Sequence, residues 1–215
     1  MSRIVVHGVP GSPYLRAALL GFEEKGIPYR LSALPLGYMR GPEGPQLHPF
    51  RRIPILDDGD FRLYETQAIL RYVDALSAQP ALQPRDPKAA ARMNQVVGIV
   101  DWYFFPQVTV KICAERLMAQ QFWGRPTNEE TVAKALPDAR TCIEELARLK
   151  GQADFMAGDT VSIADLMLAP QLAFFMLTPE GQAALKGSGL DEWLDRMTAR
   201  PSMQATESKR LVQAA

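Results

Sequence analysis

The stretch HPFRRIPILDDGDFRLYET, residues 48–66, decides the fold of this 215-residue chain. Residues 55–56, placed after a proline, predict the start of a β-strand. Asp58-Gly59 is the two-residue signal of a tight hairpin turn, and residues 61–64 predict the strand that returns from it. The stretch therefore predicts two antiparallel strands that lead the chain toward the next element.

That next element is predicted to be a helix that begins at residue 66. Apolar residues recur at helical spacing after Thr66, which makes Thr66 the predicted N-cap. The helix N-terminus thus carries an acid, Glu65, and a hydroxyl. Because such a terminus has unsatisfied amides and a positive half-charge, it favours an anionic ligand group.

The same run resembles the NPFxxxPxLxDGDxxLxES motif of cytosolic glutathione transferases, in particular the bacterial, serine-type members and the theta, phi and delta kinds. The resemblance implies that Pro54 follows a cis peptide bond and that the backbone of Ile53 binds the cysteinyl part of glutathione. It also implies that Glu65 faces the γ-glutamyl ammonium, while Thr66 faces the γ-glutamyl carboxylate. One departure is Arg51, which stands where the family often has glycine, so a backbone with positive φ would be strained there.

The glycine end of glutathione has three candidate partners in this chain. Arg52 and Arg40 are the stronger ones, because a guanidinium can bind a carboxylate at two points. His48, which replaces the family's asparagine, is expected either to hydrogen-bond within its own loop or to approach that carboxylate. The alternative for all three is an ordinary charged surface.

The preceding residues predict the first part of an α/β domain. Residues 4–6 form a short buried strand, and a helix then begins with Ser12 as N-cap and Pro13 at its first position. A second strand at 29–34 completes a parallel βαβ unit, and residues 37–46 are expected to be a loop.

A change of pattern divides the chain into two predicted domains. A proline-rich connector at 79–87 follows the helix after the hairpin, and only helical patterns follow it. The resemblance implies a thioredoxin-like α/β domain at 1–78 and an all-helical bundle domain at 88–215. The helical domain is expected to supply the electrophile pocket.

Three helical signals stand out in the second domain. One long helix is predicted from residue 88 to about residue 120, broken or bent near Pro106. Thr127 is the predicted cap of a helix over 128–149, with Glu130 completing a capping box. In the GDxxSxAD motif at 158–165, which is again similar to the glutathione transferases, Ser162 caps the next helix. Asp165 reaches back to it and is expected to be buried for folding rather than catalysis.

Ser12 is the candidate catalytic residue. The resemblance places it where serine-type transferases carry their catalytic hydroxyl and where glutaredoxin-like relatives carry a cysteine. A thiol with an ordinary pKa of about 8.5 needs roughly 2.7 kcal/mol of preferential stabilisation for its pKa to fall by about 2 units. A hydroxyl donor at the positive end of a helix can supply much of that stabilisation. The plainer interpretation is that Ser12 only caps the helix.

The electrophile pocket is predicted from aromatic residues. Tyr14 follows Ser12 in the first helix, and residues 102–105 are four adjacent aromatics in the long helix. Four adjacent residues of a helix cannot all face one way, so not all of these aromatics can line one pocket. The pocket candidates are Tyr14 from the first helix and Trp102 and Phe105 from the long helix. The other aromatic residues are expected to pack in the core or at a dimer interface.

Composition excludes several classes of protein. Lys+Arg and Asp+Glu are both 24 and the pI is about 6.7, so the basic footprint of a nucleic-acid binder is missing. We expect no signal peptide or membrane segment, and hence a cytoplasmic protein. Only Cys113 and Cys142 are present, which allows no disulfide framework or zinc cluster, and no metal is expected.

The sequence therefore predicts a homodimeric glutathione transferase that joins the thiolate of glutathione to apolar electrophiles. A glutathione-dependent isomerase, dehalogenase or peroxidase is the alternative on the same site. A non-catalytic ligand-binding or interaction protein is the alternative from a different class.

Overall fold

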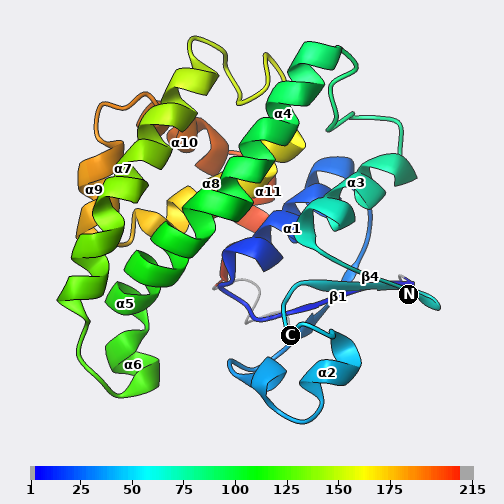
Figure 1. Ribbon diagram of the computed structural model, residues 1–215. Helices are drawn as coiled ribbons and strands as arrows, with labels where there is room; N and C mark the ends of the chain where they lie inside the picture. Colours follow the sequence, from blue (N-terminus) through cyan, green and yellow to red (C-terminus); the bar gives the residue numbers. More distant parts are fainter. Residues whose placement is uncertain (1–2, 209–215) are drawn as a thin grey trace. The chain divides into compact units, whose positions relative to one another are not determined.

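The computed structural model describes residues 3–208 of the chain (Figure 1). These residues form two compact units. The first contains residues 3–83 and 199–208, and the second contains Pro84–Thr198. The sequence placed the whole C-terminal segment with the helical domain, whereas in the structure its last described residues return to the first unit.

The first unit is built on a four-stranded mixed sheet with the order β2-β1-β3-β4. Strand β1 (Ile4–Gly8) pairs in parallel with β2 (Arg30–Ala33) and antiparallel with β3 (Ile55–Asp58). A hairpin joins β3 to β4 (Phe61–Tyr64). The predicted βαβ unit and the predicted hairpin strands are confirmed, and together they give the thioredoxin-like arrangement.

Helices cover both faces of this sheet (Figure 1). On one face lie α1 (Pro13–Lys25) and α3 (Thr66–Leu76), and on the other lie the 3₁₀ turn η1 (Tyr38–Arg40) and the short helix α2 (Gly44–Leu47). The core between the sheet and α1 and α3 consists of buried apolar side chains, namely Ile4, Val6, Leu15, Ala18, Leu19, Phe22, Leu56, Ile69 and Val73.

Two sequence predictions near the hairpin are off by one residue. The two turn residues are Gly59 and Asp60, because Asp58 is still paired with Phe61 in the ladder. The cap position of α3 is occupied by Glu65, and Thr66 is the first helical residue.

A short C-terminal helix, α11 (Pro201–Ala205), belongs to the first unit because it is hydrogen-bonded to α1. Arg16 in α1 donates to the carbonyl of Met203 at 2.6 Å. Glu24 accepts from Arg200 at 2.7 and 2.8 Å and also from Ser202. These contacts between residues more than 170 positions apart could not be inferred from local sequence patterns.

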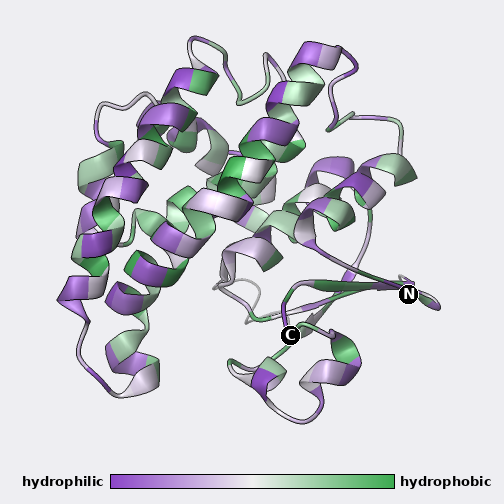
Figure 2. Cartoon of the chain, in the orientation of Figure 1, coloured by the Kyte–Doolittle hydropathy of each residue, from purple (hydrophilic) through white to green (hydrophobic). Residues whose placement is uncertain are grey.

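The second unit is entirely helical among its described residues. Figure 2 shows hydrophobic and hydrophilic residues alternating along α7, as expected for a helix that packs one face against its neighbours. The helices of the unit are α4 (Pro87–Ile99), η2 (Val100–Cys113), α5 (Ala114–Leu117), α6 (Ala119–Trp123), α7 (Glu129–Lys150), α8 (Ile163–Phe175), α9 (Pro179–Leu185) and α10 (Leu190–Thr198).

The predicted long helix is continuous over Pro87–Leu117, and Pro106 does not break it. Its middle part, η2, is wound as a π-helix. Proline removes an i→i−4 hydrogen bond and crowds the preceding turn, and wider winding accommodates both effects. By length and composition this helix is apolar enough to cross a membrane, with a mean hydropathy of 1.2. It packs against α7 and α8, however, as a core helix does.

Of the two capping predictions in this unit, the one for α7 is wrong and the one for α8 is confirmed. Asn128, not Thr127, caps α7, since its side chain accepts from the Thr131 amide at 3.0 Å. Thr127 instead donates to the Glu115 carbonyl. At α8 the prediction is confirmed, because the fully buried Asp165 reaches back to the amide of Ser162 at 2.9 Å.

Candidate functional site

Three segments of the first unit meet at one end of the sheet. The register pairs His7, near the end of β1, with Ile55, the first residue of β3, and it pairs Ile55 with Tyr64, the last residue of β4. The residues just outside these positions therefore lie at the same edge. They are the loop before α1 that ends at Ser12, the Ile53-Pro54 pair, and the Glu65-Thr66 pair.

Ser12 is positioned by its own helix. Its backbone φ of −68° and ψ of 126° are those of an N-cap, and Pro13 occupies the first helical position. The hydroxyl oxygen accepts from the Leu15 amide at 3.4 Å, which is long for this kind of bond. The capping interpretation is thus confirmed, yet it does not exclude a catalytic role. A hydroxyl that accepts through its oxygen can still donate its own proton.

Ile53 and Pro54 form a backbone edge beside this loop. The peptide bond between them is cis, as the resemblance implied. Ile53 and Val9, from the loop before Ser12, both pack against the apolar cluster of Leu34, Met39 and Ile55. Within residues 3–208, the N–H and C=O of Ile53 have no hydrogen-bonding partner. A half-buried donor and acceptor on one residue is suited to an extended peptide ligand.

Glu65 and Thr66 stand at the start of α3. Glu65 has φ 72° and an exposed side chain, whereas Thr66 is buried. The carbonyl of Glu65 accepts from the amides of Ala68 and Ile69 at 2.9 Å, so this residue fixes the first turn. A non-glycine residue in such a sparsely populated backbone region costs on the order of 1–3 kcal/mol. Such a cost is often found at ligand sites.

His48 lies inside its loop rather than at the surface. It is 1% exposed, its Nδ1 accepts from the Phe50 amide at 3.0 Å, and its ring packs on Tyr64 at 4.3 Å. Burial is the main cause that lowers the pKa of His48, the nearby Arg52 lowers it further, and Glu65 acts in the opposite direction. Of the two predicted roles, the structure supports the hydrogen bond within the loop.

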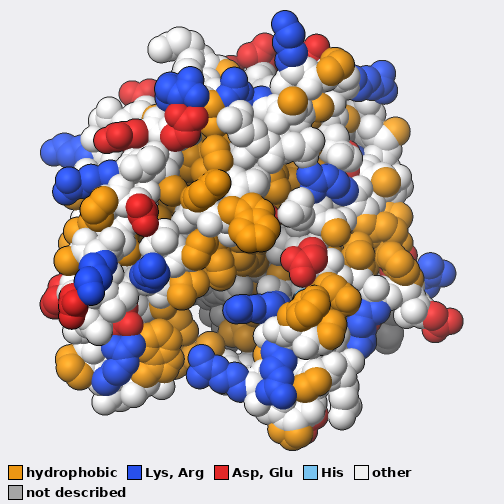
Figure 3. Space-filling model, in the orientation of Figure 1, with side chains coloured by type: hydrophobic (Ala, Val, Ile, Leu, Met, Phe, Trp, Pro, Cys, Tyr) orange, Lys and Arg blue, Asp and Glu red, His pale blue; other side chains and the backbone are white. Residues whose placement is uncertain are grey.

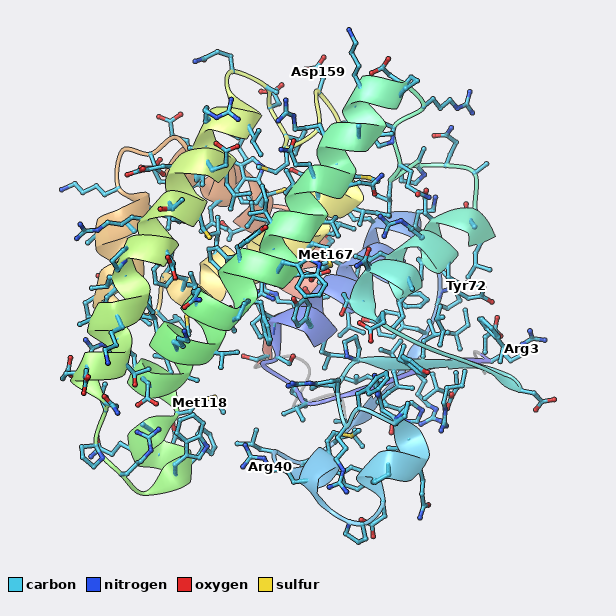
Figure 4. The ribbon with its side chains drawn as sticks, in the orientation of Figure 1. Arg3, Arg40, Tyr72, Met118, Asp159 and Met167 are labelled. Carbon is cyan, nitrogen blue, oxygen red and sulfur yellow. The ribbon has the colours of Figure 1, made fainter. Side chains whose placement is uncertain are left out.

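Arg40 and Arg52 are exposed on the segments that flank this histidine. Arg40 ends η1 and extends away from the sheet (Figure 4). Arg51, next to Arg52, has φ 55° and donates to the Arg40 carbonyl at 3.2 Å. In Figure 3 basic side chains gather around this η1–α2 part of the first unit. The arrangement offers several cations to an anionic group.

Comparisons with known proteins identify the family. Residues 11–76 match the family model "Glutathione S-transferase, N-terminal domain", and residues 129–196 match "Glutathione S-transferase, C-terminal domain". The chain belongs to the glutathione S-transferase family. The two matches together contain the Ser12 loop, the Ile53-Pro54 pair, the Glu65-Thr66 pair and the Asp165 capping box.

Curated relatives agree with this assignment over the whole chain. The chain is 28% identical to a probable glutathione S-transferase of Oryza sativa subsp. japonica, a match that covers 95% of each protein. It is 30% identical to glutathione S-transferase theta-3 of Mus musculus over 73% of this chain and 66% of that protein. The fold is similar to that of glutathione transferase F7 from Populus trichocarpa, with a TM-score of 0.84, 20% identity, and 94% and 97% of the two chains covered.

One further group of residues supports the site of this glutathione S-transferase family member. Arg62 binds the Asp57 carboxylate at 2.7 and 2.9 Å and donates to the Gln46 carbonyl at 3.1 Å, and so connects β3 and β4 to α2. Hydrogen bonds from Arg62 and His7 lower the pKa of Asp57 despite its partial burial. Asp57 and Arg62 face each other in the hairpin register. This opposite-charge cross-strand pair is a local signal that the sequence itself contains.

The predicted pocket residues belong to different units. Tyr14 is half-buried in α1 of the first unit, and Trp102 and Phe105 are in η2 of the second. Trp102 is 78% exposed, whereas Phe105 is half-buried. Their role in electrophile binding stays a prediction.

Proposed function

We propose that this protein is a glutathione transferase that conjugates glutathione to apolar electrophiles. The observation that carries the proposal is the convergence of a serine N-cap, an unpaired backbone edge at Ile53 and an exposed acid at Glu65 on one end of the sheet. Membership of the glutathione S-transferase family supports it. With an aryl halide, a C–S bond forms, the carbon–halide bond breaks, and the thiol proton passes to solvent.

The Ser12 hydroxyl is proposed to stabilise the thiolate of glutathione. Its oxygen accepts from the Leu15 amide, which leaves its proton available for the sulfur. The helix N-terminus adds a positive half-charge, and each of these two effects is worth on the order of 1 kcal/mol. Together they provide much of the roughly 2.7 kcal/mol needed to lower the thiol pKa by about 2 units.

The two ends of glutathione are proposed to bind charged residues. Glu65 is exposed and would pair with the γ-glutamyl ammonium, and Thr66 would donate to the γ-glutamyl carboxylate from the first turn of α3. Arg52 and Arg40 would bind the glycine carboxylate. His48 would hold the loop that carries Arg52 through its bond to the Phe50 amide.

The test compares the wild type with Ser12→Ala. We expect retention on immobilised glutathione for both, and a loss of about 100-fold or more in kcat/KM toward an aryl halide for the variant, as for removal of one hydrogen-bond donor from a developing anion. Asp60→Asn, in the exposed hairpin turn, serves as the control and should keep full activity. Retention without turnover in the wild type would support the non-catalytic carrier instead.

We also propose a homodimer, because exposed aromatics occur in both units. Phe50 in the first unit is 70% exposed, and Tyr103 in the second is 62% exposed. Soluble monomers rarely expose large apolar patches. The molar mass in solution tests this, and a monomer for the wild type would refute it. The free, buried Cys113 and Cys142 are consistent with a cytoplasmic location.

A further inference from the structure

Arg51 keeps a backbone conformation that arginine rarely adopts. Its φ of 55° lies in the left-handed region, where glycine or asparagine is favoured. Its side chain is exposed, and no packing requirement of a core residue explains the choice. Strained backbone residues cluster at functional sites, which motivates a functional role for Arg51.

The guanidinium of Arg51 also lies in a region with an excess of positive charge. Within residues 37–52, Arg40, Arg51 and Arg52 are the basic side chains and Glu43 is the acidic one. Among the residues described, none of the three guanidiniums has a carboxylate within the 4.0 Å of an ion pair.

Three other arginines of the first unit behave differently. Arg3, Arg62 and Arg200 are each paired with an aspartate or a glutamate of the same unit. The positive charge of the η1–α2 region is therefore available to a ligand, whereas the charge of these three arginines is used by the fold.

The side chain of Arg51 is hydrogen-bonded to a second basic residue. Its Nη1 donates to the backbone carbonyl of Arg40 at 3.2 Å, and Arg52 is its neighbour in the chain. One nitrogen of the guanidinium thus holds η1 against the loop before Pro54. The guanidinium keeps further N–H donors that can point toward a bound anion.

We propose that Arg51 is a specificity-determining residue for the glycine end of the thiol substrate. It fixes Arg40 through the backbone and adds a second cation beside Arg52, so the site selects tripeptide thiols with a free C-terminal carboxylate. This inference rests on the proposed glutathione transferase function. It assigns a role to a residue that stands where the family often has glycine.

The test separates charge from backbone strain with two variants. Arg51→Asn removes the charge and relieves the strain, because asparagine tolerates positive φ, whereas Arg51→Lys keeps both. For each variant, kcat/KM is measured with glutathione and with its glycine monoethyl ester. We expect Arg51→Asn to lower the preference for the free acid by about tenfold, as for loss of one charge-assisted bond. Arg51→Lys should keep most of that preference.

The melting temperature provides the second readout. Arg51→Asn should melt about 2–4 °C higher than the wild type, and Arg51→Lys should melt at the wild-type temperature. Arg85→Gly, an exposed arginine before α4, is the control for general surface charge and should leave the preference unchanged.

Two results would overturn the assignment. An Asn variant with an unchanged preference for the free acid would remove Arg51 from substrate selection. A lower melting temperature together with a lost preference would show that Arg51 supports the fold instead. Both readings require a wild type that turns over glutathione, and a wild type that does not would refute the proposed function itself.

Discussion

Two motifs of this chain have equally distinctive sequences but use their polar groups in opposite ways. In the capping box at the start of α8, the Asp165 carboxylate accepts from Met156, Ser162 and Trp193, and its side chain is fully buried. In the stretch 48–66, the backbone N–H and C=O of Ile53 have no hydrogen-bonding partner among the described residues. The first motif has its polar groups satisfied within the chain and holds the fold, and we propose that the second, which leaves the Ile53 backbone available, binds a ligand.

The largest effect that would sharpen this comparison is expected from Asp165→Ala. The change leaves buried donors of Met156, Ser162 and Trp193 without an acceptor, and each costs about 1–3 kcal/mol. We expect a loss of about 4 kcal/mol in the free energy of unfolding, measured by urea denaturation. Asp159→Ala, an exposed acid in the same motif, should change it by less than about 0.5 kcal/mol. Similar values for the two variants would contradict the structural role of Asp165.

An intermediate effect is expected from Glu65→Gln, which affects binding rather than stability. Loss of a charge-assisted bond to the γ-glutamyl ammonium costs about 1.5–3 kcal/mol, so the Kd for glutathione should rise by about 10- to 100-fold. Because the side chain is exposed, the melting temperature should stay close to that of the wild type. Titration calorimetry and thermal unfolding measure the two quantities. An unchanged Kd would remove Glu65 from the site.

The smallest effect is expected from the ion pair between Glu115 and Arg125 in the second unit. A hydrogen bond from Arg125 lowers the pKa of Glu115 to about 2, against the effect of burial and with help from the Asn128 amide. A folded-state pKa below the unfolded value stabilises the protein above pH 4.5 or so and loses that stabilisation as the pH falls toward about 2.

Thermal unfolding as a function of pH tests this contribution. Between about pH 4.5 and 2 the wild type should lose a few degrees more than Glu115→Gln, because only the wild type has a carboxylate to protonate at this position. Parallel curves for the two proteins would show that the Arg125–Glu115 pair does not stabilise the unit.

Local signals explain why much of the fold was predictable. Ser12-Pro13 and Gly26 mark the ends of α1, and the proline at 54 and the glycine of the turn mark β3 and β4. The capping box at Ser162 was predictable for the same reason. All of these signals act within a few residues, so neighbours in the sequence suffice to recognise them.

Two of the predictions that failed depend on distant residues. Asn128 replaces Thr127 as the cap of α7 because Glu115, from another helix, accepts hydrogen bonds from both residues. Its carboxylate accepts from the Asn128 amide, and its carbonyl accepts from the Thr127 hydroxyl. The predicted loop at 37–46 contains η1 and α2, which pack so closely that a Cβ at Gly44 would lie 2.2 Å from the Met39 carbonyl oxygen. Neither contact is visible in the local pattern.

In the candidate site, too, local motifs were predictable from the sequence and contacts between distant residues were not. The resemblance located Ser12, Ile53, Glu65 and Thr66, because these residues occur at fixed spacing in a short motif. It suggested a strained backbone at Arg51 but assigned this residue no role, because its contact with Arg40 appears only in three dimensions.

In the proposed mechanism, Ser12 lowers the thiol pKa of bound glutathione. The most direct test is an ultraviolet difference titration of the thiolate in the binary complexes of the wild type and Ser12→Ala, since it needs no electrophile. The account predicts a pKa about 2 units below the free value of about 8.5 in the wild type, and one close to the free value in Ser12→Ala. Equal pKa values in the two complexes would contradict it.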